Sequence, residues 1–221
     1  MTKLAAQPAR FITLEGGEGA GKSTQIKLLN EWLEGKGINT CLTREPGGSP
    51  GAEQIRDLVL KGATDRWTGM TEALLMTASR AEHVENKVKP ALEAGNWVLC
   101  DRFYDSSIAY QGAGRGLGME RVKQLQTLAL GDFQPDLTII LDLPVKIGLS
   151  RAIARESAKS DMEDRFERMD ISFHVALRNA FLEIAKQESE RCVVLNADAE
   201  PNTLQSQIQA LILTKFGQPD G

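Results

Sequence analysis

The strongest chemical signal in the sequence is a glycine-rich segment that leads into an expected helix. Residues 16–23 read GGEGAGKS and fit the pattern G-x-x-x-x-G-K-[ST]. In such a loop, backbone N–H groups converge on phosphate oxygens, the lysine reaches the β- and γ-phosphates, and the serine hydroxyl binds Mg²⁺. The sequence therefore predicts an ATP site, with a glycine-rich structural turn as the alternative. Its expected members are Gly16, Gly17, Glu18, Gly19, Ala20, Gly21, Lys22, Ser23 and Thr24.

A second segment places an acidic residue directly before an arginine. The apolar run Val98-Leu99-Cys100 predicts a strand, and Asp101 and Arg102 come at its carboxyl end. Ligands of open α/β folds bind at this edge of the sheet. Asp101 is expected to hold a metal-bound water, so that Ser23 and Asp101 together form the Mg²⁺ site. Arg102 is expected to bind a phosphate group.

Several arginines lie at or near the carboxyl ends of expected strands. An acceptor that carries its own phosphate would need such a group of cations, although each one alone is more often an ordinary surface residue. They are Arg44, Arg56, Arg80 and Arg102. A GTPase would instead need the motif N-K-x-D, and the only Asn-Lys pair, at residues 86–87, lacks the aspartate. The pattern therefore argues against a GTPase.

Short apolar runs alternate with longer stretches of helical period, which is typical of a parallel sheet crossed by helices. Strands are expected at Phe11–Glu15, Ile38–Thr43, Trp97–Asp101, Leu137–Asp142 and Cys192–Asn196. Helices are expected at Gly21–Glu34, near Ala52–Leu60, at Gly69–Glu93 and Met119–Leu130, within Val145–Glu188, and at Thr203–Phe216. These elements predict a P-loop NTPase fold. It is an α/β fold with a doubly wound, five-stranded parallel sheet and helices on both faces.

One P-loop domain over residues 1–221 is expected, because no repeat or linker divides the chain. The segment Arg151–Glu167 differs in composition, since it consists largely of alanine and polar residues with charges of both signs. We expect a mobile lid there, between two helices. An exposed helix face with ion pairs is the alternative.

The composition bounds the class of protein. With 221 residues, 42% hydrophobic and 25% charged, the chain is typical of a soluble globular protein. A formal net charge of -4 argues against nucleic acid or a membrane as partner, and no apolar run approaches the ~18 residues of a membrane span. The polar N-terminus lacks the apolar region of a signal peptide, so a cytoplasmic protein is expected. Three cysteines are expected to be buried free thiols, and two histidines favour neither a metal cluster nor a catalytic triad.

Three further segments resemble thymidylate kinase and occur in the order of that family. They are residues 43–48 (TREPGG), 101–112 (DRFYDSSIAYQG) and 164–167 (DRFE). The likeness runs from Phe11 to about Asn196. It implies transfer of the γ-phosphoryl group of ATP to thymidine 5′-monophosphate (dTMP), giving dTDP and ADP. It also implies Mg²⁺ and a homodimer whose small-molecule partners are ATP and dTMP.

The resemblance further implies roles at the acceptor site. Arg56 and Arg102 resemble ligands of the acceptor phosphate. Arg80, Ser107 and Gln111 match positions that face the thymine edge in the family. Tyr110 matches a position beside the deoxyribose. Glu45 and Pro46 match a turn whose peptide bond is cis in the family. The chemistry of Arg80 independently predicts that it rejects cytosine. A guanidinium group can only donate hydrogen bonds, and thymine O4 can accept one, whereas cytosine has an amine donor at that position.

One position departs from the family. Many members have a phenylalanine that stacks on the thymine four residues before the position of Arg80, where this chain has Met76. A thioether can still lie against a π-face, so weaker base binding is expected. Ordinary helix packing is the alternative for Met76.

The remaining catalytic residues lie in the glycine-rich loop and in the lid. In the family, a carboxylate at the position of Glu18 approaches the sugar 3′-hydroxyl. Because this loop carries no arginine, another cation must stabilise the transition state. Arg151 and Arg155 lie one helical turn apart and resemble the lid arginines of a bacterial subgroup, although solvated lid charges are the alternative. The expected catalytic residues are Lys22, Arg102, Arg151, Arg155 and Glu18.

Two other functions share some of these features. A deoxynucleoside kinase also has a P-loop and an acidic residue before an arginine, but it needs a carboxylate base to deprotonate a sugar hydroxyl. A non-catalytic nucleotide sensor would bind ATP without turnover. The group of arginines favours a phosphate-bearing acceptor, and the presence of Lys22, Ser23 and Asp101 argues against a sensor.

Overall fold

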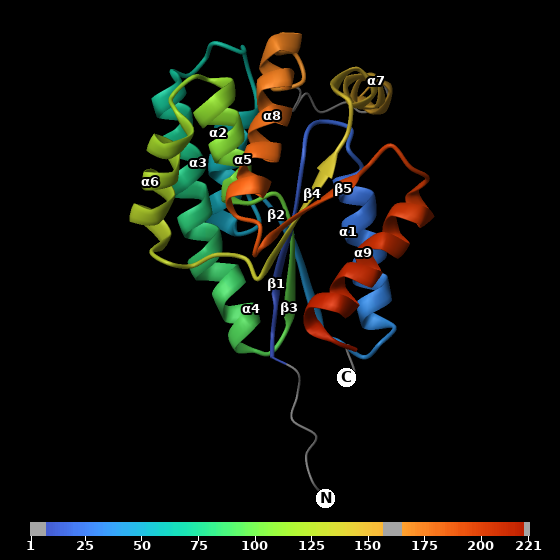
Figure 1. The fold of residues 1–221 in the computed structure, drawn as a ribbon. Coiled ribbons are helices and arrows are strands. Elements are labelled where there is room, and N and C mark those ends of the chain that lie inside the picture. Colours follow the sequence, from blue (N-terminus) through green and yellow to red (C-terminus); the bar gives the residue numbers. More distant parts are fainter. Residues whose placement is uncertain (1–7, 157–164, 219–221) are drawn as a thin grey trace, which may run out of the picture.

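The computed structural model describes residues 8–156 and 165–218, with only the backbone at positions 155 and 156. A five-stranded sheet runs through the molecule (Figure 1). Its strands are β1 (Phe11–Glu15), β2 (Thr40–Arg44), β3 (Trp97–Asp101), β4 (Leu137–Asp142) and β5 (Cys192–Asn196). Their order is β2-β3-β1-β4-β5, and all four pairings are parallel. The predicted parallel sheet is confirmed.

The central strand β1 brings the glycine-rich loop beside the Asp101-Arg102 pair. Leu14 of β1 is in register with Asp101 of β3, and Glu15 is in register with Ile140 of β4. From β1 the chain first builds one half of the sheet, with β2 and β3, and then crosses to the other half, with β4 and β5. Ligands of doubly wound sheets bind at such a switch point, outside the carboxyl ends of the strands.

Helices cover both faces of the sheet (Figure 1). Helices α1 (Lys22–Glu34) and α9 (Pro201–Phe216) pack together on one face. The other side holds α2 (Pro50–Leu60), α3 (Gly69–His83), α4 (Lys89–Glu93), α5 (Tyr104–Ser107), α6 (Met119–Leu130) and α8 (Ile171–Gln187). It also holds the π-helical turns η1 (Val84–Val88) and η2 (Ile108–Gly114), and α7 (Val145–Glu156) follows β4.

Helices α1, α2 and α9 begin within two residues of their predicted starts, and three other elements differ from the prediction. Strand β2 begins at Thr40, because the N–H of Ile38 donates to the carbonyl of Leu33 and closes the end of α1. The helix predicted over Gly69–Glu93 is divided into α3, η1 and α4, since Pro90 has no N–H to donate to the preceding turn. The long segment Val145–Glu188 contains α7 and α8, and residues 157–164 between them lie outside the described residues.

The helical stretch made by α5 and η2 was not predicted. Its glycines and serines favour turns over helices, so composition gives no helical signal there. Tertiary contacts hold it instead. A Cβ on Gly114 would lie 2.4 Å from the ring of Phe173, so only glycine permits this approach to α8.

The core consists of clusters on both faces of the sheet. One joins β1, β3 and β4 to α1 and α9, and another packs η2, α3 and α6 against α8. All three cysteines are free thiols; two are buried as predicted, whereas Cys41 is only half-buried. In the part of the chain that the structure describes, no helix has the length and apolar character to cross a membrane.

Candidate active site

The glycine-rich loop joins β1 to α1 and turns sharply at three glycines. The φ angles of Gly16, Gly19 and Gly21 are +133°, +66° and +88°, a region that favours glycine. A Cβ on Gly19 would lie 2.1 Å from the carbonyl oxygen of Gly148, so α7 packs directly on the loop. The ammonium group of Lys22 donates to the carbonyl oxygens of Gly16, at 3.0 Å, and of Gly17, at 2.7 Å. The side chain of this lysine therefore lies inside the loop.

The two expected metal-binding residues are brought together. The hydroxyl of Ser23, at the start of α1, donates to Oδ2 of Asp101 at 2.7 Å. The described residues contain no group of three or more His, Cys, Asp or Glu side chains that could hold a metal. An oxygen pair of this kind fits Mg²⁺, which keeps several waters and takes few protein ligands beside substrate phosphates.

Arg102 reaches back from β3 to the glycine-rich loop. Its φ of +71° is unusual for a residue with a side chain. The guanidinium donates to the carbonyl of Gly16, at 2.9 Å, and to Glu18, at 3.1 Å, and it lies 5.0 Å from the ring centroid of Tyr110. The strained backbone thus aims the arginine at the loop beside Lys22.

Glu18 is held as a carboxylate in this arrangement. It accepts hydrogen bonds from Arg102 and from the hydroxyl of Tyr110. Burial raises the pKa of Glu18, but the charges of Arg102 and Lys22 outweigh burial and bring the pKa down to about 2. Burial and the nearby Arg102 lower the pKa of Lys22 to about 8.

Glu15, which the sequence analysis did not single out, holds the turn that carries Arg102. Its carboxylate is fully buried and accepts from the N–H of Phe103, at 2.7 Å, and from the N–H and hydroxyl of Ser106, at 3.1 and 2.6 Å. Burial, followed by the charge of Asp105, raises the pKa of Glu15 to about 7. The signal for it was the one charged residue of this strand, at the strand's last position.

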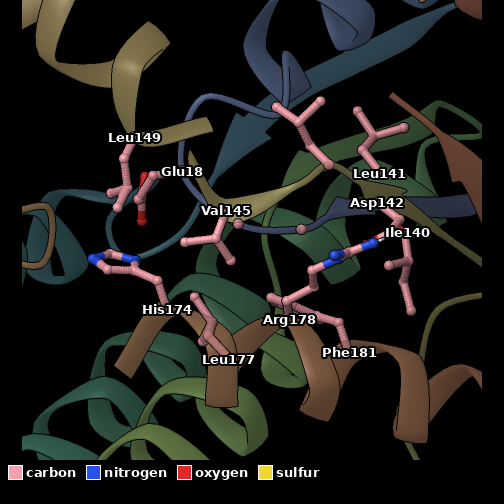
Figure 2. A pocket seen from close by; sticks show the side chains of 13 residues that line it. Glu18, Ile140, Leu141, Asp142, Val145, Leu149, His174, Leu177, Arg178 and Phe181 are labelled. Carbon is pink, nitrogen blue, oxygen red and sulfur yellow. Dashed lines mark hydrogen bonds and ion pairs between the residues drawn. The ribbon is translucent and has the colours of Figure 1, made fainter. Parts of the chain in front are cut away.

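A small cavity of about 20 Å³ lies behind the glycine-rich loop, toward β4 and α8 (Figure 2). The side chains of Glu18 and His174 face it from opposite elements, and Arg178 pairs with Asp142 at its other end through contacts of 2.7 and 2.8 Å. The cavity can hold a water molecule but is too small for a nucleotide.

Arg80 is the centre of a second polar group, on the helices. Its guanidinium donates to Glu45 at 2.6 Å, to Ser107 at 3.0 Å, to Gln126 at 2.6 Å and to the carbonyl of Phe103 at 3.1 Å. Four of its five N–H groups therefore have partners in the described protein. The structure brings Arg80 and Ser107 together, as predicted, but leaves little of the guanidinium free.

Glu45 and Pro46 form the expected turn. The bond between them is cis, and the carboxylate of Glu45 also meets Nδ1 of His83 at 2.9 Å. Arg56 donates to the carbonyl oxygen of Pro46 at 2.7 Å. The turn thus links Arg56 to the group around Arg80.

Met76 lies one turn before Arg80 on α3. It is buried, with 9% of its surface exposed, and belongs to the apolar cluster that contains Tyr110 and Phe166. Gln111, also expected at the thymine edge, is fully buried on η2. Its Nε2 donates to Glu72 at 2.9 Å. Glu72 was missed, although it precedes Met76 by four residues and Arg80 by eight on one helix.

The expected lid lies partly outside the described residues, which leave out residues 157–164 and the side chain of Arg155. Arg151 lies 3.6 Å from the carboxylate of Asp198 in the loop after β5, and 45% of its side chain is exposed. Arg165, just after the undescribed segment, is fully buried and pairs with Glu72 at 2.7 Å. The structure therefore does not bring Arg151 to the glycine-rich loop.

The site has two sides. The loop side consists of Glu15, Glu18, Lys22, Ser23, Asp101 and Arg102. The helix side consists of Glu45, Glu72, Met76, Arg80, Ser107, Tyr110 and Gln111.

The strand, glycine-rich loop and helix at the switch point of a parallel sheet define a nucleotide-binding protein of the P-loop class. Residues 14–208 match the family model for thymidylate kinase. The chain is 51% identical to the thymidylate kinase of Rhodopseudomonas palustris over 95% of this chain and 91% of that one. It is 49% identical to that of Caulobacter vibrioides, over 94% and 97% of the two chains. The chain belongs to the thymidylate kinase family.

A solved structure agrees in fold. The crystal structure of thymidylate kinase from Ehrlichia chaffeensis superposes with a TM-score of 0.74. It is 34% identical in sequence, and the match covers 92% of this chain and 98% of that one.

Proposed function

We propose that the two sides of the site together carry out the phosphorylation of dTMP. As a member of the thymidylate kinase family, the chain is a nucleoside monophosphate kinase that transfers the γ-phosphoryl group of ATP to dTMP, giving dTDP and ADP. The observation that carries the assignment of residues is the position of Arg102. Its guanidinium lies against the glycine-rich loop beside Lys22, where a donor and an acceptor phosphate would meet.

On the loop side, the backbone of residues 16–21 and the side chains of Lys22, Ser23 and Thr24 bind the phosphates of ATP. Lys22 and Arg102 balance the charge of the transferring group. Ser23, directly, and Asp101, through water, would hold Mg²⁺, which neutralises phosphate charge when bound. The 2.7 Å contact between these two side chains supports that pairing.

On the helix side, the base of dTMP lies near Met76, Arg80, Ser107 and Gln111. Tyr110 lies beside the deoxyribose. Arg56, whose side chain contacts the turn Glu45-Pro46, binds the acceptor phosphate. The buried guanidinium of Arg80 can only donate, so it favours thymine O4 over the cytosine amine.

Glu18 orients the sugar 3′-hydroxyl. In this structure Arg151 pairs with Asp198, so the lid arginines Arg151 and Arg155 supply a cation to the transition state when the lid closes over ATP. Glu18 would be a poor general base, because its pKa is about 2 and Arg102 already holds its carboxylate. Glu18 therefore does not supply the base that a deoxynucleoside kinase needs to deprotonate a sugar hydroxyl. A sensor would not need the strained backbone that aims Arg102 at the loop.

We further propose a single kinase domain, a cytoplasmic location and a homodimer. Exposed leucines on three neighbouring helices support the dimer. Leu58 on α2, Leu74 on α3 and Leu128 on α6 are 41%, 51% and 86% exposed, and these helices lie side by side (Figure 1).

The test is ADP release from ATP in the presence of Mg²⁺ with a panel of nucleosides and nucleoside monophosphates. Turnover should be fastest with dTMP. Turnover on thymidine without turnover on dTMP would make the chain a deoxynucleoside kinase. ATP binding without turnover on any acceptor would make it a sensor.

A further inference from the structure

The side chain of Gln111 carries a buried acceptor without a partner. In the described part of the chain, no hydrogen bond reaches its Oε1 atom, and the residue has no exposed surface. Buried polar atoms nearly always have partners, so this oxygen calls for an explanation. A donor on a bound ligand would supply the missing partner.

Glu72 determines which end of the Gln111 amide has no hydrogen-bond partner. The Nε2 group donates to Oε1 of Glu72 at 2.9 Å. An ionised carboxylate only accepts hydrogen bonds, so the amide cannot turn its oxygen toward Glu72. The carbonyl oxygen must therefore be the end that is free for a ligand.

Glu72 itself is held firmly. It is fully buried, and two guanidinium groups face it, from Arg115 at 2.9 Å and from Arg165 at 2.7 Å. Arg115 follows Gln111 by four residues at the end of η2, whereas Arg165 belongs to the segment before α8. These two guanidinium groups hold the carboxylate of Glu72 in place.

The contacts form two hydrogen-bonded pairs between α3 and the α5–η2 stretch. At one end Arg80 donates to Ser107, and at the other Gln111 donates to Glu72. Residues four apart on a helix share a face, so Met76 lies on the α3 face between these pairs. An acceptor and a donor thus flank the position where the base is expected.

We propose that Glu72 is a positioning residue that sets base specificity by holding the Gln111 carbonyl oxygen toward the base. This inference rests on the proposed function. Thymine presents an imide N–H next to its O4, whereas the corresponding ring nitrogen of cytosine is an acceptor. A fixed carbonyl oxygen at Gln111 accepts a hydrogen bond from the thymine N–H. The same oxygen is repelled by the acceptor nitrogen of cytosine.

The experiment compares dTMP as substrate with dCMP as competitor. KM and kcat for dTMP and the inhibition constant of dCMP are measured for the wild type, Glu72→Gln, Gln111→Met and the double variant. Glutamine at position 72 can accept or donate, so the Gln111 amide becomes free to turn. We expect the dCMP inhibition constant divided by the KM for dTMP to fall about tenfold in Glu72→Gln, with a larger change in the KM for dTMP than in kcat.

The double variant separates positioning from a general structural role. If Glu72 acts through the amide, Glu72→Gln should not change the ratio further once Gln111 is methionine. An equal further loss in that background, or an unchanged ratio in folded Glu72→Gln, would overturn the proposal. Absence of dTMP turnover in the wild type would instead overturn the proposed function, and this inference with it.

Glu72→Asp guards against loss of folding. It keeps a negative charge for Arg115 and Arg165 but withdraws the carboxylate from Gln111 by one methylene. The ratio should fall in the same direction, and an unchanged ratio would contradict the proposal. Glu82→Gln, on the same helix without a contact to Gln111, is the matched control and should leave the ratio as in the wild type.

Discussion

The loop side and the helix side of the site use their arginines differently. Arg102 keeps 16% of its side chain exposed and donates partly to a backbone carbonyl of the loop, as Lys22 does. Arg80 keeps only 3% exposed, and buried protein groups occupy most of its guanidinium. Phosphate oxygens can replace the contacts that Arg102 and Lys22 make with the loop. On the helix side, few hydrogen-bonding groups are left without a protein partner and free for a ligand. The loop side therefore suits the phosphates common to all nucleotides, and the helix side suits the distinction between bases.

The largest effect should come from the loop side. Lys22→Ala removes a cation from the transferring phosphoryl group, and loss of such a group costs ~10²–10³-fold in kcat. Turnover and thermal unfolding should be measured together, with Lys27→Ala, an exposed lysine on the same helix, as control. A folded Lys22→Ala variant with unchanged kinetics would rule out the P-loop assignment.

The lid arginines test whether the loop side needs a further cation. At least one of Arg151→Ala and Arg155→Ala should lower kcat by ~10²-fold or more, while ATP binding changes less than ~10-fold, because the charge is needed mainly in the transition state. Lys146→Ala, an exposed cation on α7, is the control. Losses confined to ATP binding would mean that the lid only clamps the nucleotide. No loss in either variant would make Arg102 the next residue to test.

Glu15→Gln tests the turn that aims Arg102. It removes an acceptor from the Phe103 and Ser106 contacts, and one such hydrogen bond contributes ~0.5–1.5 kcal/mol, so kcat should fall by up to about tenfold. Burial favours the protonated form of Glu15, whose pKa is about 7 in the folded protein instead of 4.5. Its contribution to stability is therefore complete below pH 4.5 and is lost as the pH rises to about 7.

The measurement is the free energy of unfolding of the wild type minus that of Glu15→Gln, which should decrease over that pH range. Glu18→Gln is the counterpart, because the pKa of Glu18 is about 2. The contribution of Glu18 to stability is present above pH 4.5 and is lost as the pH falls toward 2. The free energy of unfolding of the wild type minus that of Glu18→Gln should therefore decrease as the pH is lowered. A flat difference for Glu15 would contradict the role of burial.

The smallest effect should come from the helix side. Met76→Phe restores an aromatic face for the thymine, and such stacking contributes ~0.5–1.5 kcal/mol to binding. The KM for dTMP should therefore fall about two- to tenfold, without a change in the KM for ATP. Met119→Phe, at the edge of the same apolar cluster, is the control. A loss of stability without a gain in affinity would show that Met76 is core packing, since its site is already filled.

The strands of the fold could be predicted almost completely, because buried parallel strands are short apolar runs whose ends are marked by glycine or charged residues. The α5–η2 stretch could not. Its helical form depends on Gly114 fitting against Phe173 and on Glu15 accepting from Ser106, which are contacts between residues far apart in the sequence.

The two sides of the site also differ in how far they could be predicted. The loop side follows from a contiguous motif and from one acidic residue at a strand end. The helix side depends on partners from separate elements, such as Gln126 for Arg80 and Arg165 for Glu72. Only the spacing of Glu72, Met76 and Arg80 on α3 was visible in the sequence, and spacing alone does not distinguish a carboxylate that positions a neighbour from a surface one.

The altered basicity of Lys22 has a consequence for the heat of nucleotide binding. Without ligand, its ammonium group is partly deprotonated above about pH 8, because burial and Arg102 disfavour the charge. The negative charge of bound ATP phosphates favours the ammonium form again. Binding should therefore take up protons from the buffer, increasingly between pH 7 and 9. Calorimetry in buffers of different ionisation enthalpy would count them, and the count should vanish in Lys22→Ala.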